Sequence, residues 1–246
     1  MNIALYGYGK MGKAIEEVAL SRGHRIILRV DHRNAGSAPE GADVAIEFSK
    51  PDVALANMRL CLQHKVPVVV GTTGWYDHLN EIKSLVQSEQ GSLLWASNFS
   101  IGVNLFFKLN KYLAGLMDGQ PAYQVAITET HHIHKLDAPS GTAITLARDI
   151  DLRSTKYSGW KLHEQQPKDV AAKTTGTDTM PVAIHSERIG EVPGTHAVTW
   201  KSPEDRLSIT HEAFGRHGFA LGAVVAAEWI PGRTGLFTMD DLLDGN

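Results

Sequence analysis

The chain has 246 residues, of which 43% are hydrophobic and 21% charged, so it can bury a sizeable core and does not have the composition of a disordered protein. The formal net charge of -3 excludes a broad basic surface for nucleic acid, and the lack of an apolar run of about 18 residues excludes a transmembrane helix. Because the N-terminus is predicted to be a strand rather than a signal peptide, and Cys61 is the only cysteine, we expect a cytoplasmic protein with no internal disulfide and no membrane partner.

The first predicted element is a short apolar strand over residues 2–6, which runs directly into the pattern G-x-G-x-x-G. In this pattern the first glycine permits a tight turn, the second lets the backbone approach a pyrophosphate, and the third lets the following helix pack on the strand. An amphipathic helix over residues 13–22 follows. We therefore predict a dinucleotide-binding loop formed by Gly7, Tyr8, Gly9, Lys10, Met11 and Gly12.

The second predicted strand, over residues 25–30, ends at Asp31. The spacing from Gly12 to Asp31 is close to the roughly 20 residues expected for the acidic group that binds the adenosine ribose. Asp31 favours a ribose without a 2′-phosphate, whereas Arg33 is either a partner for that phosphate or a solvated surface charge. NADH and NADPH are therefore both candidate cofactors.

Strands and helices continue to alternate up to about residue 98. Strands are predicted over residues 42–48, 67–70 and 92–96, with helices over 51–64 and 76–90. This alternation predicts a Rossmann-like, doubly wound parallel sheet, in which ligands bind beyond the carboxyl ends of the strands. The candidate cofactor contacts at those ends are Gly71, Thr72, Thr73, Ala96, Ser97, Asn98 and Phe99, with the Phe99 ring covering a nicotinamide face.

The pattern then changes to strands that alternate polar and apolar residues, together with two helices. It predicts an α+β substrate and oligomerisation domain with a mostly antiparallel sheet. The predicted strands are 123–130, 182–189, 196–201 and 206–213, and the helices are 103–117 and 141–153.

A polar, irregular segment over residues 154–176 is predicted to be mobile. A helix over 220–230 and a terminal segment over 235–243 are predicted to return to the first domain. The expected division is therefore 1–100 with 214–246 for the dinucleotide-binding domain, and 101–213 for the substrate domain.

Residues 129–143 contain the densest set of titratable groups in the chain. Imidazole titrates near neutrality, so His131, His132 and His134 are candidate proton donors, and Lys135 adds a cation for an anionic substrate. Core packing does not explain this cluster, because such side chains are poor candidates for burial without partners. The segment therefore indicates chemistry on an anion.

The same segment ends in a predicted helix start. Ser140 is the expected N-cap, and with Gly141 and Thr142 it presents backbone N–H groups and hydroxyls at the positive end of the helix dipole. Such a site suits a carboxylate or phosphate, although an ordinary capped helix is an equal alternative.

The three histidines are also potential metal ligands. The crowding of His131 against His132 and the lack of a carboxylate or thiolate at ligand spacing disfavour zinc, and Lys135 would repel it. We therefore predict no metal site.

With these motifs identified, the chain resembles the 4-hydroxy-tetrahydrodipicolinate reductases, also called dihydrodipicolinate reductases, over essentially its whole length. The resemblance rests above all on residues 131–143, together with residues 7–12, 71–74 and 97–104. Residues 210–213 and Arg216 also fit the closing strand of that family.

The resemblance implies an NADH- or NADPH-dependent reduction of a cyclic dicarboxylate, 4-hydroxy-tetrahydrodipicolinate, to tetrahydrodipicolinate in lysine and diaminopimelate biosynthesis. It implies that His131 is the general acid and that Lys135 holds a carboxylate and assists the protonation. It also implies a homotetramer formed through the substrate-domain sheets. The implied substrate contacts are His132, Lys135, Ser140, Gly141, Thr142 and Arg216.

Two alternatives remain from different classes. A dehydrogenase acting on an amino acid such as aspartate is the enzymatic alternative. A non-catalytic NAD(H)-binding module is the other, and it is disfavoured because such a module does not need an acid, an ammonium and an anion pocket together.

Overall fold

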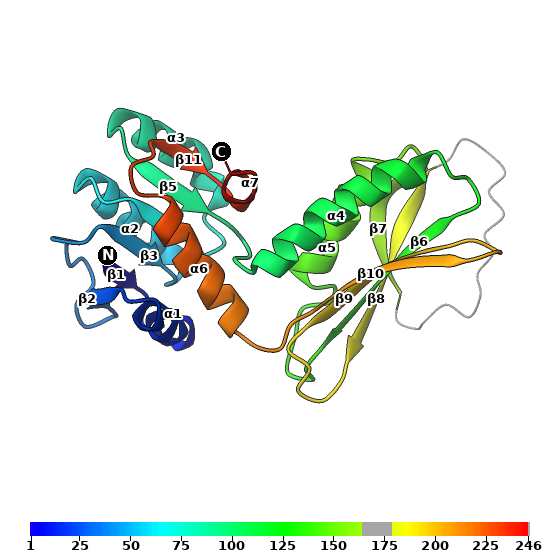
Figure 1. Ribbon diagram of the computed structural model, residues 1–246, viewed down its shortest axis with the longest axis horizontal. Coiled ribbons are helices and arrows are strands. Elements are labelled where there is room, and N and C mark those ends of the chain that lie inside the picture. Colours follow the sequence, from blue (N-terminus) through cyan, green and yellow to red (C-terminus); the bar gives the residue numbers. More distant parts are fainter. Residues whose placement is uncertain (164–178, 246) are drawn as a thin grey trace. The chain divides into compact units, whose positions relative to one another are not determined.

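The computed structural model describes residues 1–163 and 179–245 and divides into two compact units (Figure 1). The first unit contains Met1–Asn104 and Arg216–Asn246, and the second contains Leu105–Gly215. The long helix α4 (Ile101–Asp118) begins in the first unit and continues into the second. Within the described ranges, no helix is long and apolar enough to cross a membrane.

The first unit is built on a six-stranded sheet with the order β11-β5-β4-β3-β1-β2, in which every neighbouring pair is parallel. This confirms the predicted doubly wound parallel sheet. Because β1 lies between β2 and β3, the strand order reverses there, and the loops after β1 and β3 flank the point where such sheets bind ligands. The strands are β1 (Asn2–Tyr6), β2 (Arg25–Val30), β3 (Val44–Glu47), β4 (Val68–Val70), β5 (Ser92–Trp95) and β11 (Gly235–Phe237).

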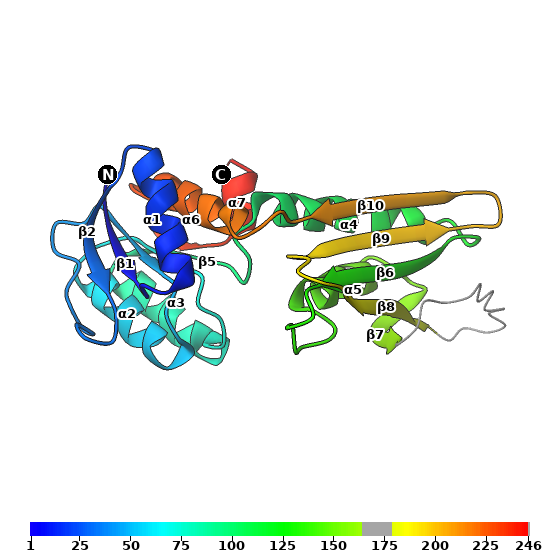
Figure 2. The same cartoon turned by 90° about the horizontal axis from the view of Figure 1, so that it is seen from below.

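Helices cover both faces of this sheet. Figures 1 and 2 show α1 (Lys10–Ser21) beside α6 (His217–Trp229) on one face, with α2 (Pro51–Gln63) and α3 (Leu79–Ser88) on the other. Side chains alternate along a strand, so β1 sends Ile3 and Leu5 into the cluster under α1 and α6, and Ala4 and Tyr6 into the cluster under α2 and α3. The short elements η1 (Tyr76–His78) and α7 (Met239–Leu243) complete the unit.

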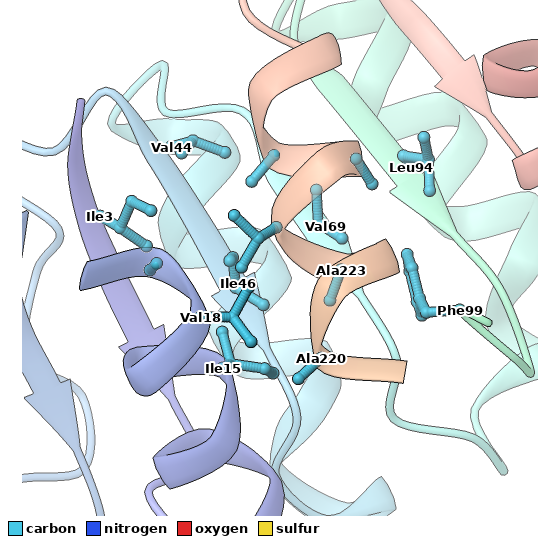
Figure 3. Close-up of a cluster of buried hydrophobic side chains, with 14 of the residues drawn as sticks. Ile3, Ile15, Val18, Val44, Ile46, Val69, Leu94, Phe99, Ala220 and Ala223 are labelled. Atoms are coloured by element: carbon cyan, nitrogen blue, oxygen red, sulfur yellow. The ribbon is translucent and has the colours of Figure 1, made fainter. Parts of the chain in front are cut away.

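Figure 3 shows the cluster that joins α1, α6 and the sheet. Val18 of α1 and Ala223 of α6 pack with Ile46 and Val69 of the sheet, and all four are buried. Small residues on α6 let this helix lie close to the segment that follows β5, since a Cβ at Gly222 would collide with the carbonyl oxygen of Phe99. The same cluster therefore fixes the segment that follows β5, where cofactor contacts are predicted.

The second unit contains a five-stranded sheet with the order β10-β9-β6-β8-β7. The pairs β10–β9 and β9–β6 are antiparallel, whereas β6–β8 and β8–β7 are parallel. The predicted α+β class is confirmed, but the sheet is mixed rather than mostly antiparallel. The strands are β6 (Gln124–His131), β7 (Tyr157–His163), β8 (Met180–Arg188), β9 (Thr195–Lys201) and β10 (Arg206–Glu212).

The connection from β6 through α5 (Gly141–Asp151) to β7 explains why the sheet is mixed. The chain crosses from β6 through α5 to β7, and then enters β8, which runs parallel to both β6 and β7. Strand β7 lies in the segment predicted to be irregular and mobile. It is an edge strand whose side chains are mostly exposed, so it carries no alternating pattern. Residues 164–176 of that segment lie outside the described residues.

Strand β6 positions two of the titratable side chains. Its residues alternate between half-buried and buried, and the buried set continues from Val125 and Ile127 to Glu129 and His131. Helices α4 and α5 pack on this buried face of the sheet. Because side chains alternate along a strand, the Glu129 carboxylate and the His131 imidazole lie on the helix-covered side of the sheet, where each needs a partner.

Candidate active site

The loop after β1 has the geometry that its glycine pattern predicts. Gly7 has φ +92°, and a Cβ there would collide with the carbonyl oxygen of Phe48, so only glycine fits. Gly12 lies in the first turns of α1, packed against the carbonyl of Gly7. Gly9 is the N-cap of α1 and faces open space. The positive end of α1 is therefore open to an anion, and Lys10 beside it is exposed.

Tyr8 is tied to the sheet by two charged residues. Its hydroxyl donates to Glu16 of α1, and the Arg29 guanidinium both donates to Glu16 and lies 5.8 Å from the centre of the Tyr8 ring. The hydrogen bond from Arg29 lowers the pKa of Glu16, whereas the bond to Glu16 raises the pKa of Tyr8. This network fixes the side of the loop that faces β2.

Asp31 follows β2 and forms an exposed ion pair with Arg33. Arg33 Nη2 lies 2.6 Å from Asp31 Oδ2, and the Arg33 side chain is 79% exposed. Hydrogen bonds from the side chain and the backbone of Arg33 lower the pKa of Asp31 to about 2. A charged carboxylate therefore stands at the end of β2, where an adenosine ribose binds in this fold.

The loops after β3 and β4 are joined by hydrogen bonds. The backbone N–H of Ser49 donates to Thr72 Oγ1 at 2.8 Å, and Trp75 Nε1 donates to the carbonyl of Thr72 at 2.8 Å. Glu47 is fully buried beneath them and accepts from Ser49 and Asn57, and burial raises its pKa. Thr72 is therefore a bracing residue in this structure, while its neighbour Thr73 is exposed.

Phe99, which is predicted to cover a nicotinamide face, lies in the core. Phe99 is 2% exposed and belongs to the core cluster drawn in Figure 3, with its ring centre 5.5 Å from that of Phe48. An apolar ring after a strand can turn to either side, and here the core offers more apolar contact. Ala96, Ser97 and Asn98 precede it at the carboxyl end of β5 and are not buried.

In the second unit, His131 ends β6 and is bonded to a carboxylate on the same strand. Its Nδ1 atom is hydrogen-bonded to Glu129 Oε2, and the Glu129 side chain is fully buried. The opposite carboxylate oxygen accepts from Arg188 Nη2 at 3.2 Å and from the Ser140 N–H at 3.3 Å. Burial alone would raise the pKa of Glu129, but the hydrogen bonds from His131 and Arg188 lower it to about 2.

Arg188 of β8 also holds the loop that follows β6. Its Nε donates to the carbonyl of Lys135 at 3.3 Å, and its Nη2 donates to the carbonyl of Asp137 at 2.7 Å. Within this loop, Lys135 Nζ lies 2.8 Å from both carboxylate oxygens of Asp137 and lowers the pKa of that group. Arg188 therefore holds the loop that carries the Lys135 ammonium, and this ammonium is paired with the exposed carboxylate of Asp137.

The two remaining histidines of the cluster differ in surroundings. His134 is exposed and pairs with Glu191 at 2.9 Å, which agrees with a bracing role. His132 is half-buried, and its Nδ1 is buried with no hydrogen-bond partner among the described residues. His132 therefore has an unused polar atom beside the loop, whereas His134 does not need a ligand.

Ser140 is the N-cap of α5, as predicted. Its Oγ accepts from the Ala143 N–H at 3.2 Å and lies 2.9 Å from His196 Nε2. Because this hydroxyl is buried and engaged, a ligand at the helix start would meet Gly141 and Thr142 instead, whose N–H groups have no acceptor within the helix. Arg216 is exposed and belongs to the first unit, unlike the other predicted substrate contacts.

Sequence reasoning did not single out Glu129, Arg188 or His196 as site residues. Their side chains approach His131 from β6, β8 and β9, which are distant along the chain. Only Glu129 carried a usable signal, because a residue two positions before His131 on a strand shares its face.

Glu129, His131 and His196 offer ligand atoms within 4.8 Å of one another, so distance alone would allow a metal. The Arg188 guanidinium on Glu129 opposes a second cation there, and burial together with the charge of His131 lowers the pKa of His196 to about 4. We therefore describe Glu129 and His131 as a hydrogen-bonded pair, to which His196 is linked through Ser140.

Comparison with known proteins identifies relatives of the whole chain. Residues 1–99 match the family "Dihydrodipicolinate reductase, N-terminus", and residues 102–243 match "Dihydrodipicolinate reductase, C-terminus". A 4-hydroxy-tetrahydrodipicolinate reductase of Christiangramia forsetii is 47% identical over 245 residues, covering 99% of this chain and 98% of the relative. One from Laribacter hongkongensis is 34% identical, covering 93% and 82%.

Two solved structures share the fold. A dipicolinate-bound dihydrodipicolinate reductase from Paenisporosarcina sp. TG-14 has a TM-score of 0.77 at 23% identity, with 97% of both chains covered. An amine dehydrogenase from Mycobacterium smegmatis has a TM-score of 0.56 at 12% identity, covering 98% of this chain and 95% of the other.

Proposed function

The chain belongs to the dihydrodipicolinate reductase family, and from that premise we propose that it acts on 4-hydroxy-tetrahydrodipicolinate in lysine and diaminopimelate biosynthesis. The substrate loses its 4-hydroxyl group as water to give dihydrodipicolinate, and the hydride and the proton then convert that conjugated ring to tetrahydrodipicolinate. The observation that carries this proposal is the nearly full-length identity with the reductase of Christiangramia forsetii. The match of both units to the two parts of one family supports it, because cofactor binding and substrate chemistry each have their expected unit.

Cofactor binding is assigned to the first unit. Gly7 and Gly12 allow a close-packed turn in which a Cβ would collide with backbone, and Gly9 faces open space at the N-terminus of α1, which fits a pyrophosphate. Asp31 would accept from the ribose hydroxyls, and Arg33 would leave Asp31 to pair with a 2′-phosphate, so the site would accept NADH and NADPH. The residues proposed for this role are Gly7, Tyr8, Gly9, Lys10, Met11, Gly12, Asp31, Arg33, Gly71, Thr72, Thr73, Ala96, Ser97 and Asn98.

The reduced nicotinamide supplies a hydride when bound, and the second unit supplies the proton. His131 is the proposed acid, because its Nδ1 is held by Glu129 and its Nε2 is left for the substrate. Its proton would go to the ring atom that becomes electron-rich on hydride addition.

Lys135 is the proposed carboxylate ligand. It already holds a carboxylate, that of Asp137, so a substrate carboxylate would take the place of a similar partner. Gly141 and Thr142 would bind the second carboxylate at the start of α5, with His132 and Arg216 as further contacts. A dianionic ring would thereby be matched by two cationic or helix-dipole sites.

We also propose a cytoplasmic homotetramer that forms through the sheet of the second unit and has neither nucleic-acid nor membrane partners. Support comes from the sheet face opposite α4 and α5, where small residues such as Ala126, Thr128, Ala197 and Thr199 are half-buried. Small side chains let a second sheet approach closely.

The experiment that tests the function is oxidation of NADH and NADPH, in separate cuvettes, while a synthase makes the substrate in place from pyruvate and aspartate semialdehyde. Oxidation that depends on the synthase is expected, and its rates rank the cofactors. No oxidation by protein shown to bind NADH would contradict the proposal and favour an amino-acid dehydrogenase or a non-catalytic binding module.

A further inference from the structure

A buried carboxylate lies behind the proposed acid. Glu129 has no exposed surface, so it cannot meet a substrate, yet it makes one hydrogen bond to His131 and a second, with its other oxygen, to Arg188. A buried carboxylate placed against an imidazole is expensive to maintain unless both are fully partnered. Packing alone therefore does not explain why Glu129 lies at this position.

Resting on the proposed function, we propose that Glu129, fixed by Arg188, is a positioning residue that orients His131 and stabilises its protonated form before proton transfer. Nδ1–H of His131 stays on Glu129 throughout, and Nε2 faces the substrate. In the transfer the Nε2–H bond breaks, its electron pair stays on the imidazole, and the proton joins the ring carbon made electron-rich by the hydride from NADH or NADPH. The imidazole is left neutral with its proton on Nδ1.

The orientation follows from strand geometry. Glu129 and His131 are two residues apart on β6, so their side chains leave the same face of the strand, and only Nδ1 of the imidazole is bonded to the carboxylate. A hydrogen bond at one ring nitrogen sets the tautomer and directs the other nitrogen outward. His131 is therefore held in the form with its proton on Nδ1.

Gly194 keeps the other nitrogen accessible. It has φ +154°, which L side chains rarely adopt, and a Cβ at this position would lie 3.1 Å from His131 Nε2. A side chain at position 194, just before β9, would occupy the space next to Nε2 of His131. Glycine leaves that space for a substrate.

Glu129 is the carboxylate that is hydrogen-bonded to the imidazole of His131. Glu129 is ionised, because its hydrogen bonds with His131 and Arg188 outweigh its burial and lower its pKa to about 2. His196 of β9 contacts the ring edge at 5.1 Å between centres, but its low pKa, caused by burial, keeps it neutral. Burial also lowers the pKa of His211 on β10, and the remaining cations nearby are Lys135 and Arg188.

The direction of the pH effect follows. The acid works only while His131 is protonated, so kcat falls as pH rises through the pKa of the acid. An ionised Glu129 places a negative charge against the imidazole. Glu129→Gln removes the negative charge, so the fall moves to lower pH by about 1 unit or more. A residue that only packs would lower kcat by the same factor at every pH.

The test is the pH profile of kcat at saturating substrate and cofactor for the wild type, Glu129→Gln, Glu129→Asp and Glu187→Gln. Glu187 is the matched control, because it is a carboxylate on the adjacent strand that accepts from Thr130 at 3.0 Å and does not bond His131. We expect the fall in kcat to lie at lower pH in Glu129→Gln and nearer to its wild-type position in Glu129→Asp. In Glu187→Gln we expect it at the wild-type position. A uniform loss of kcat with an undisplaced profile would overturn the proposal.

A second measurement covers the case in which Glu129→Gln does not fold. In the wild-type protein with ¹⁵N-labelled histidine, assigned by the loss of signal in His131→Asn, neutral His131 is expected to carry its proton on Nδ1. A proton on Nε2 would overturn the proposal. This measurement needs no turnover, so an inactive wild type with Nδ1–H would reject the proposed function and leave the positioning intact.

Discussion

Asp31 and Glu129, two described carboxylates with strongly lowered pKa values, lie in opposite surroundings. Both pKa values are about 2, but Asp31 is held there by an exposed arginine and Glu129 by a buried network that outweighs its burial. Asp31 can therefore exchange Arg33 for a ribose hydroxyl with little change in the protein. Glu129 cannot change partners without uncovering a buried charge.

The proposed cofactor site of the first unit and the histidine segment of the second unit differ in the same way. The cofactor edge of the first unit consists of glycines, backbone N–H groups and a few exposed side chains, so recognition there depends on backbone shape. The histidine segment of the second unit depends on charges removed from water, where electrostatic interactions are stronger. We therefore expect substitutions at the first site to act on cofactor binding, and those at the second on catalysis and stability.

The largest expected effect is that of His131→Ala. Loss of the acid should lower kcat by a factor of about 10² or more, while NADH affinity changes little because the imidazole belongs to the other unit. Initial rates and calorimetry with NADH measure the two. His134→Ala, which removes an exposed histidine paired with Glu191, is the matched control and should retain activity. Lys135→Ala should resemble His131→Ala, and unchanged turnover in both would contradict the mechanism.

Arg188→Met sharpens the comparison through stability. It leaves Glu129 buried and without its cation, so the free energy of unfolding should fall by about 3 kcal/mol. Arg33→Met, at an exposed ion pair, should change it by an amount too small to detect. Urea denaturation at neutral pH measures both, and equal losses would contradict the proposed difference between the pairs.

The same network predicts how stability depends on pH. The pKa of Glu129 is lowered on folding, so its contribution is present above its unfolded value of about 4.3 and is lost as pH falls toward 2. Urea denaturation between those limits should show this loss in the wild type and a weaker dependence in Glu129→Gln. The same slope in both proteins would show that Glu129 is not ionised in the fold.

Gly7→Ala tests the shape of the cofactor loop. The new Cβ meets the Phe48 carbonyl at a positive φ, so the strain alone should cost about 1–2 kcal/mol and NADH binding should weaken in addition. Gly36→Ala, at φ +84° in open space, carries similar strain without the collision. Calorimetry that finds equal NADH affinity in both variants would remove Gly7 from the cofactor site.

Asp31→Ala and Thr142→Val have smaller expected effects. Asp31→Ala should weaken NADH more than NADPH, because only the unphosphorylated ribose depends on the carboxylate, and calorimetry with each cofactor measures this. Equal losses would place Asp31 away from the ribose. Thr142→Val should raise KM for the dicarboxylate with little change in kcat, and an unaltered KM would remove the start of α5 from the substrate site.

Local signals in the sequence predicted the fold of the first unit well. The glycine pattern, the acidic residue at Asp31 and the alternation of strands and helices depend on neighbours along the chain, and the parallel sheet was confirmed. The second unit was predicted less completely, because a half-buried strand has the same alternating pattern whether its neighbours are parallel or antiparallel. Strand β7 was missed, since its exposed edge position removes that pattern.

The site divides in the same way. His131, Lys135 and Ser140 were singled out from their spacing within one segment; the Ser140 cap is confirmed, and the roles of His131 and Lys135 stay predictions. Arg188 and His196 were not, because β8 and β9 bring them to His131 only through the sheet order. The burial of Phe99 was not predicted, because a sequence does not say to which side an aromatic ring turns.

The measurement that tests the central claim most directly uses NADH deuterated at both C4 positions, with the substrate made in place by its synthase, and determines the mass of the product. One deuterium should appear in tetrahydrodipicolinate for each NADH oxidised. His131→Ala should give the same labelled product at a rate lower by about 10². Oxidation of NADH without deuterium in the product would contradict a reduction by hydride transfer.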